Sequence, residues 1–455
     1  MSDAAALVDR AAALARDQRM EEALEAVLAA ARLAPNDPRA AIGCAQLSFE
    51  TWRPAASLFA KARRIAPRNV DLVRNHALAL SAEGDGAAAT RTLEDALAAS
   101  PFWVDGHRTL AAMRITSAEG GAFDRSYAAA CRLPGAPIAL WMGWFQQHAM
   151  MKRWEEARRI LEDATSALGA VRMIEIAALY LDAESGAYSS LDTRFAAFAA
   201  LNDPGLDLCA VRYLLRRGDP DAAAQVALRH TGRPSARAFW PYLSLCWRMT
   251  EDARAQWLDG DPLYAAAVDL DLDAQELSAL AEFLRDLHRM KAPYPEQSVR
   301  GGTQTDRQLF FNSNARIQSV RSKVTNAIAQ HIAALPASDV RHPLLSQRRD
   351  MIRFSGSWSV RLEGAGFHAP HTHVLGWISS ALYISLPEHM GPAPAGQLSL
   401  GAPPPELGLA LAPRRQIEPR PGRLALFSST LWHSTEPFAS GERLTIAFDI
   451  ALPGA

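Results

Sequence analysis

The chain has 455 residues, of which 49% are hydrophobic and 21% are charged. This composition is typical of a globular protein with a sizeable core, and the length favours two or three domains. A formal net charge of −1 gives the chain no general attraction to nucleic acid or to anionic lipid, so we expect neither a nucleic acid nor a membrane as partner.

The N-terminal residues give no sign of export. The first twenty residues contain three aspartates and no long apolar run, so they do not resemble a secretory signal. The longest apolar stretch, residues 133–145, is interrupted by Pro134 and Pro137 and is too short to span a bilayer. The four cysteines form no C-x-x-C pair, which argues against a zinc ribbon or a disulfide framework. We therefore expect a cytoplasmic protein.

A repeat of about 34 residues occupies the first part of the chain. Three segments end in proline, at Pro35, Pro67 and Pro101. Twelve residues before each proline stands an alanine, and eight residues before it stands a larger apolar residue: Ala23, Ala55 and Ala89, with Val27, Phe59 and Leu93. Small residues allow two helices to cross closely, and proline ends a helix because it has no N–H to donate. The pattern predicts pairs of packed helices.

Over residues 5–105 these segments resemble the tetratricopeptide repeat. The resemblance implies a helical solenoid that binds a protein or a peptide, and we expect degenerate repeats from residue 106 to about 250. The alternative is a scaffold that only packs on the rest of the chain. An aromatic cluster near the end of this region, Trp240, Tyr242, Trp247 and Trp257, is predicted to form the contact with the second domain.

The chain changes character near residue 255. Helical patterns are expected over 273–290 and 315–335, separated by a glycine-containing loop at 301–305. Short β-prone runs then follow, over 351–354, 358–362, 378–386, 398–400, 424–427 and 444–450. Short strands broken by Gly and Pro favour a β-sandwich or barrel. We therefore predict an α+β protein with two domains, 1–250 and 251–455.

A group of histidines and one arginine lie within these strands. His371 and His373 form an H-x-H motif, and two residues at i and i+2 of an extended chain point to the same side, as two ligands of one metal must. His433 follows 60 residues later, and Arg443 ten residues after that. Strand alternation places Arg443 and Thr445 on the inner face. A buried arginine needs an anionic partner, and the strand offers no acid beside it, so a ligand carboxylate would satisfy it. Taken alone, the H-x-H could be a surface pair and the arginine could reach water.

Together these residues resemble the iron- and 2-oxoglutarate-dependent oxygenases, which carry an H-x-D/E motif, a distal histidine and a later arginine on a double-stranded β-helix (jelly roll). The resemblance extends over residues 285–450, and residues 297–305 resemble the opening block of a bacterial subgroup. It assigns metal ligation to His371, His373 and His433, and 2-oxoglutarate binding to Arg443, Thr445, Tyr383 and Ser379. It implies Fe(II) as cofactor, 2-oxoglutarate and dioxygen as cosubstrates, and hydroxylation of a C–H bond of a substrate, expected to be a protein or peptide bound by the repeats.

His373 departs from the family pattern, because it stands where the family has a carboxylate. Three neutral imidazoles leave a metal more positive and shift preference toward Zn, Cu or Ni. Glu363 and His368 are alternative ligands. Two other functions stay open: a cupin-like metal enzyme that does not use 2-oxoglutarate, although the acid that cupins have after H-x-H is missing, and a non-catalytic interaction scaffold, which the replaced carboxylate favours.

Overall fold

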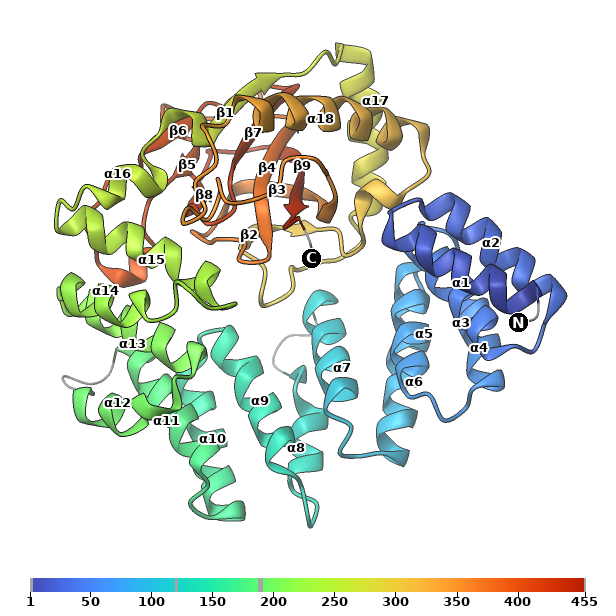
Figure 1. Ribbon diagram of the computed structural model, residues 1–455. Helices are drawn as coiled ribbons and strands as arrows, with labels where there is room; N and C mark the ends of the chain where they lie inside the picture. The colour runs from blue at the N-terminus through green and yellow to red at the C-terminus, as the bar shows by residue number, and fades with distance from the viewer. Residues whose placement is uncertain (1–2, 119–121, 187–190, 454–455) are drawn as a thin grey trace. The chain divides into compact units, whose positions relative to one another are not determined.

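The computed structural model describes residues 3–118, 122–186 and 191–453 (Figure 1). The chain forms two compact units. The first contains residues 1–147, 289–295 and 306–319, and the second contains residues 148–288, 296–305 and 320–455. Each unit therefore combines segments that are distant in the sequence, and the predicted boundary between residues 250 and 251 lies inside the second unit. In the described parts of the chain, none of the helices has the length and apolarity needed to cross a membrane.

The first unit begins with antiparallel helices in pairs. Their bounds are α1 Asp3–Arg16, α2 Met20–Leu33, α3 Pro38–Glu50, α4 Ala56–Ile65, α5 Asp71–Ala82, α6 Gly86–Ala99, α7 Val104–Thr116, α8 Arg125–Cys131 and α9 Ile138–Met150, the last of which runs into the second unit. Helices α2, α4 and α6 each end two residues before a proline of the repeat, and the alanines and larger residues of the repeat are buried. A methyl group on Gly43 of α3 would lie 2.8 Å from Val27 of α2, so this helix crossing needs a residue without a side chain. The predicted helix pairs are confirmed here.

The helices of the second unit continue to residue 259. They are α10 Trp154–Leu168, α11 Arg172–Ser185, α12 Asp192–Phe198, α13 Pro204–Arg216, α14 Pro220–Leu228, α15 Ala236–Met249 and α16 Arg254–Asp259. The predicted aromatic cluster lies in a core formed with α13, α14 and two residues from the sheet region, Leu407 and Trp432. Trp240 and Trp247 therefore pack where helix α15 meets the sheets.

The second unit also contains two antiparallel sheets. The larger has the strand order β1-β7-β4-β9-β3-β2, and the smaller has the order β6-β5-β8. Their bounds are β1 Ala265–Asp269, β2 Val299–Gln304, β3 Phe354–His368, β4 Gly376–Ser385, β5 Leu398–Leu400, β6 Arg415–Ile417, β7 Arg423–Ser428, β8 His433–Thr435 and β9 Glu442–Ala451. The apolar face that alternation predicts on β9 is buried, since Leu444, Ile446, Phe448 and Ile450 are inaccessible to solvent.

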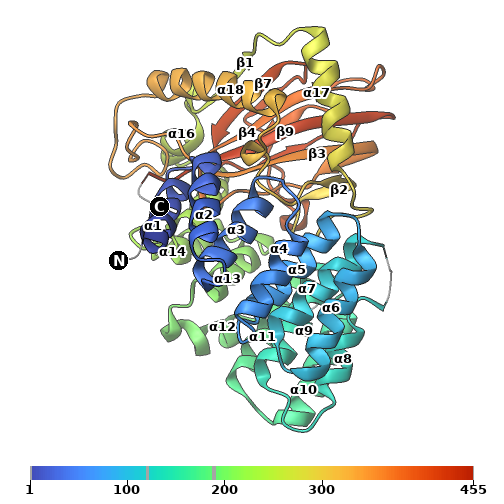
Figure 2. The ribbon, with the colours of Figure 1, turned by 90° about the vertical axis from the view of Figure 1, so that its right-hand side faces the viewer.

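Two helices lie beside the larger sheet (Figures 1 and 2). These are α17, Ala274–Leu287, and α18, Ala315–Ala334, close to the predicted ranges. Asp273 and Glu276 form a capping box at the start of α17, which fixes its first residue. The guanidinium of Arg321 on α18 lies 5.8 Å from the ring centroid of Phe354 on β3, so this helix packs against the sheet.

The expected loop over 301–305 is wrong, because β2 occupies most of it. Residues 299–304 pair with β3, and the register shifts between Arg300 and Gly302. Gly301 has φ +68°, a conformation that side chains rarely adopt, and a Cβ on Gly302 would lie 2.2 Å from the carbonyl oxygen of Arg361. The glycines therefore permit close strand pairing at a bulge and do not mark a loop.

Candidate metal centre

The backbone of two separate segments brings three histidines together. His371 and His373 lie in the connection between β3 and β4, and His433 is the first residue of β8. His371 and His433 form an antiparallel bridge with two backbone hydrogen bonds of 3.0 Å, and the amide of His373 donates to the carbonyl of Ser429 at 2.9 Å. One ring nitrogen from each of the three lies within 4.8 Å of the others, which is the arrangement that one metal ion requires.

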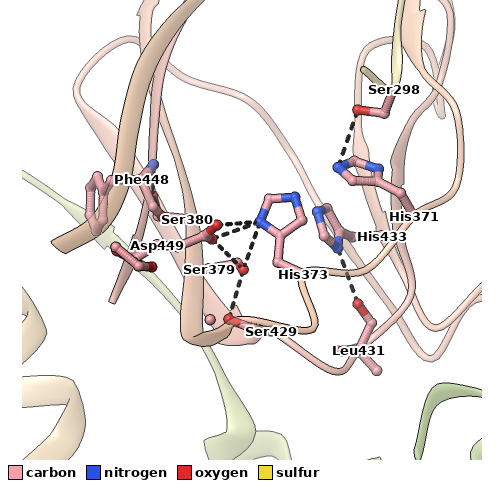
Figure 3. Close-up of polar contacts among 12 residues, drawn as sticks. Ser298, His371, His373, Ser379, Ser380, Ser429, Leu431, His433, Phe448 and Asp449 are labelled. Atoms are coloured by element: carbon pink, nitrogen blue, oxygen red, sulfur yellow. Dashed lines mark hydrogen bonds and ion pairs between the residues drawn. The ribbon is translucent and has the colours of Figure 1, made fainter. Parts of the chain in front are cut away.

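Hydrogen bonds define the tautomers of two of these rings. Nδ1 of His371 lies 2.8 Å from the carbonyl oxygen of Ala369. Nδ1 of His433 lies 3.1 Å from the carbonyl oxygen of Leu431 (Figure 3). A carbonyl oxygen only accepts, so each Nδ1 carries the proton and donates it. The Nε2 atoms of both rings consequently carry no proton, which is the form of imidazole that binds metals. Nε2 of His371 also lies 3.2 Å from the hydroxyl of Ser298 (Figure 3).

The third ring is held by a carboxylate. Nδ1 of His373 lies 2.7 Å and 2.6 Å from the two carboxylate oxygens of Asp449, which is largely buried (Figure 3). The hydroxyl of Ser379 lies 2.6 Å from Asp449 Oδ1 and 2.8 Å from the hydroxyl of Ser429. Sequence reasoning missed the contact of Asp449 with His373, although strand alternation places Asp449 on the same face of β9 as Arg443.

Burial favours the uncharged form of His371 and of His433. Desolvation, together with the neighbouring imidazoles, lowers the pKa of His371 and of His433 well below its ordinary value. Desolvation and the charge of Arg443 lower the pKa of the nearby His368 to about 3. Since a metal competes with protons for these nitrogens, neutral rings at pH 7 favour metal binding.

Arg443 lies buried on β9 with most of its hydrogen-bonding capacity unused. One guanidinium nitrogen donates to the carbonyl oxygen of Gly396 at 3.1 Å, and the guanidinium carbon lies 4.9 Å from the ring centroid of Tyr383. Within the described ranges, no carboxylate pairs with it, and both Arg443 Nε and the Tyr383 hydroxyl lack hydrogen-bond partners. Burial lowers the pKa of Arg443 and raises that of Tyr383. The buried Thr445 pairs with Tyr383 across β9 and β4.

The remaining predicted residues lie outside the three-histidine cluster. Nδ1 of His368 lies 2.9 Å from the hydroxyl of Ser298, which in turn lies 3.2 Å from Nε2 of His371. Glu363 is exposed and lies 3.6 Å from Arg361. Ser379 contacts Asp449, as described above, and so lies on the His373 side of the site.

The fold and the site together define a β-domain with a candidate metal centre, joined to helical repeats. Residues 356–449 match the model of a family described as "Putative 2OG-Fe(II) oxygenase". This match confirms, for that segment, the resemblance to the iron- and 2-oxoglutarate-dependent oxygenases. No curated protein matches the chain.

Solved structures of hydroxylases and of a tetratricopeptide repeat protein are each similar to part of the chain. A prolyl-4-hydroxylase of Pseudomonas putida is 21% identical, with coverage of 42% of this chain and 94% of its own and a TM-score of 0.29. A prolyl hydroxylase of Trichoplax adhaerens, solved with a hypoxia-inducible-factor peptide fragment, is 14% identical, with coverage of 46% and 93% and a TM-score of 0.30. A tetratricopeptide repeat protein of Parabacteroides merdae is 12% identical, with coverage of 55% and 98% and a TM-score of 0.34.

Proposed function

We propose that the protein is an Fe(II)- and 2-oxoglutarate-dependent dioxygenase that hydroxylates a C–H bond. His371, His373 and His433 would bind the ferrous ion, and Arg443 would bind the distal carboxylate of 2-oxoglutarate. The observation that carries this proposal is the buried guanidinium of Arg443, which has no acidic partner among the described residues and lies in the same β-domain as three converging imidazoles. A cupin-like site gives that arginine no role.

The donor set fits a ferrous ion. Imidazole nitrogens are ligands that iron accepts, and a bound ferrous ion would supply the redox chemistry that couples decarboxylation of 2-oxoglutarate to hydroxylation. The chain contributes orientation and the exclusion of water. The Nδ1 hydrogen bonds fix the rings, and Arg443 with the unpaired Tyr383 hydroxyl offers two donors to one carboxylate. Thr445 would add a hydroxyl on the same strand face.

The proposed architecture around the site is a double-stranded β-helix. The two antiparallel sheets, with strand orders β1-β7-β4-β9-β3-β2 and β6-β5-β8, support this architecture. The bridge between His371 and His433 adds one short segment to the smaller sheet beside β8.

We further propose that residues 1–250 act as a repeat array that binds a protein or peptide substrate, since a joined binding module raises the local substrate concentration. Because the Ser379 hydroxyl contacts Asp449, we propose that it orients the Asp449–His373 pair and does not contact the cosubstrate.

The decisive experiment compares Arg443→Ala with a matched arginine variant. Arg361 on the neighbouring strand β3 is already paired with Glu442, so Arg361→Ala is the control. With Fe(II) present, we measure anaerobic 2-oxoglutarate binding by calorimetry and aerobic succinate formation. Loss of a charge-assisted contact of about 1.5–3 kcal/mol weakens binding roughly 10- to 100-fold in Arg443→Ala, while Arg361→Ala stays within a few-fold of wild type.

The alternatives give different results in this experiment. Wild-type protein that binds metal but neither binds nor consumes 2-oxoglutarate would favour the cupin-like enzyme. Protein that binds no metal would favour the interaction scaffold. Equal 2-oxoglutarate affinity in wild type and Arg443→Ala would contradict the role given to Arg443.

A further inference from the structure

The metal centre has a carboxylate close by, although none of its three candidate ligands is acidic. Asp449 contacts His373 through both oxygens, at 2.7 Å and 2.6 Å from Nδ1. Within the described residues, the sole basic side chain at ion-pair distance from Asp449 is His373 itself. A buried carboxylate beside an imidazole, with no other basic partner, is costly unless a further positive charge lies near.

We propose, building on the function proposed above, that Asp449 is a positioning residue of the metal centre that replaces the missing carboxylate ligand from behind His373. By accepting a hydrogen bond from the Nδ1–H group, the Asp449 carboxylate directs Nε2 of His373 toward His371 and His433 and makes that nitrogen a stronger ligand. It also places one negative charge next to the ion. The net charge of the centre then equals that of a site with two histidines and one carboxylate, which suits a ferrous ion.

The surroundings of Asp449 hold the carboxylate in this position. The Ser379 hydroxyl contacts Asp449 Oδ1, and Ser379 also contacts Ser429. A methyl group on Gly376 would lie 2.6 Å from the Ser429 hydroxyl oxygen and 3.4 Å from Cβ of Asp449. The strand β4 therefore packs closely against Ser429 and Asp449, with room for only a hydrogen atom at residue 376.

The chain contains a second histidine–aspartate pair that serves as a matched control. His230 Nε2 lies 2.7 Å from Asp207, and its Nδ1 lies 3.1 Å from the hydroxyl of Ser235. Both ring nitrogens of His230 are thus occupied, and Arg229 also pairs with Asp207 at 3.1 Å. This pair lies outside the group of three histidines that could hold one metal ion, so Asp207 serves as a control that leaves the metal centre unchanged.

The first test measures Fe(II) affinity of the full chain under anaerobic conditions by competition with a chelator. Asp449→Asn keeps the shape of the side chain but removes its charge, and we expect a 10- to 100-fold weaker affinity, the range found when such supporting groups are removed. Asp207→Asn should bind Fe(II) within threefold of wild type. Thermal unfolding without metal checks that both variants fold.

The second test uses a double variant. His373→Asp supplies a carboxylate ligand and removes the imidazole that Asp449 orients. If Asp449 acts through His373, adding Asp449→Asn to His373→Asp should change Fe(II) affinity by less than threefold, whereas the same change weakens binding 10- to 100-fold when His373 is present. A merely structural Asp449 would weaken binding equally in both backgrounds.

The outcomes separate this proposal from the proposed function. If wild type binds Fe(II) and Asp449→Asn binds it equally well, or if Asp449→Asn weakens binding in both backgrounds, the role of Asp449 is wrong and the oxygenase proposal stands. If wild type binds no Fe(II) while both variants fold, both proposals fail.

Discussion

At the scale of single residues, the Tyr383 hydroxyl is the most informative group. It is fully buried beside Arg443 and, in the described part of the chain, has no hydrogen-bond partner. An unsatisfied buried hydroxyl costs about 1–3 kcal/mol, so a protein that keeps one gains nothing in stability from it. A ligand that accepts its hydrogen bond gives the hydroxyl a use.

We therefore predict that Tyr383→Phe leaves the thermal unfolding temperature unchanged or higher, and weakens 2-oxoglutarate binding about 3- to 10-fold. Tyr264→Phe is the control, because the Tyr264 hydroxyl donates to the carbonyl oxygen of Trp257 at 3.2 Å. Its loss should lower stability by about 1 kcal/mol without changing 2-oxoglutarate affinity. Calorimetry of both variants checks this, and a destabilised Tyr383→Phe with unchanged affinity would count against the cosubstrate pocket.

The sequence predicts which side chains lie close together only where motif spacing or the alternation of a strand places them on the same face. The H-x-H motif, the distal His433 and the inward parity of Arg443 are visible in the chain, and the structure brings the histidines together. The contact of Asp449 with His373 depends on how β9 lies against the connection that follows β3. That register is set by tertiary packing, and no local pattern encodes it.

At the scale of elements, strand prediction succeeded for the long alternating runs and for the short strand β5, and it missed β1, β2, β6 and β8. The elements β1, β6 and β8 have three to five residues, and β2 contains two glycines. Such strands exist because neighbouring strands provide their hydrogen bonds, so their own sequences carry little periodic signal. The helices α17 and α18 were predictable since each has a cap or a long apolar face.

His288 at the end of α17 connects three elements and gives a pH-dependent stability. Its ring nitrogens lie 2.8 Å from the Thr303 hydroxyl on β2 and 3.0 Å from the Ser359 hydroxyl on β3. Burial, with a smaller effect of the Arg361 charge, lowers the pKa of His288 from 6.5 to about 4. Between these values the unfolded chain binds more protons than the folded one, so stability falls as the pH is lowered.

We expect the free energy of unfolding to lose roughly 1–2 kcal/mol through this group between pH 7 and pH 5. His288→Gln removes the titrating ring and should reduce the difference between the two pH values by that amount. Urea denaturation of wild type and variant at both pH values measures it. An unchanged pH dependence in the variant would show that His288 does not contribute.

At the scale of the second unit, helix α15 supports both segments that carry the histidines. The Arg237 guanidinium donates to two carbonyl oxygens in the segment that follows His373. These belong to Val374, the next residue, at 3.1 Å, and to Gly376. The Trp432 indole, next to His433, donates to the carbonyl oxygen of Pro241 at 3.1 Å. The aromatic cluster could be predicted from the spacing of its residues. The hydrogen bonds of Arg237 could not, because their acceptors are backbone atoms more than a hundred residues away in the sequence.

The account depends on a metal ion held by His371, His373 and His433. The most direct test is anaerobic equilibrium dialysis of the full chain against Fe(II), followed by measurement of bound iron in wild type and in four single alanine variants. We predict about one ion per chain in wild type and in the control His368→Ala, and a large loss in His371→Ala, His373→Ala and His433→Ala. Iron bound equally by all five proteins, or by none of them, would contradict it.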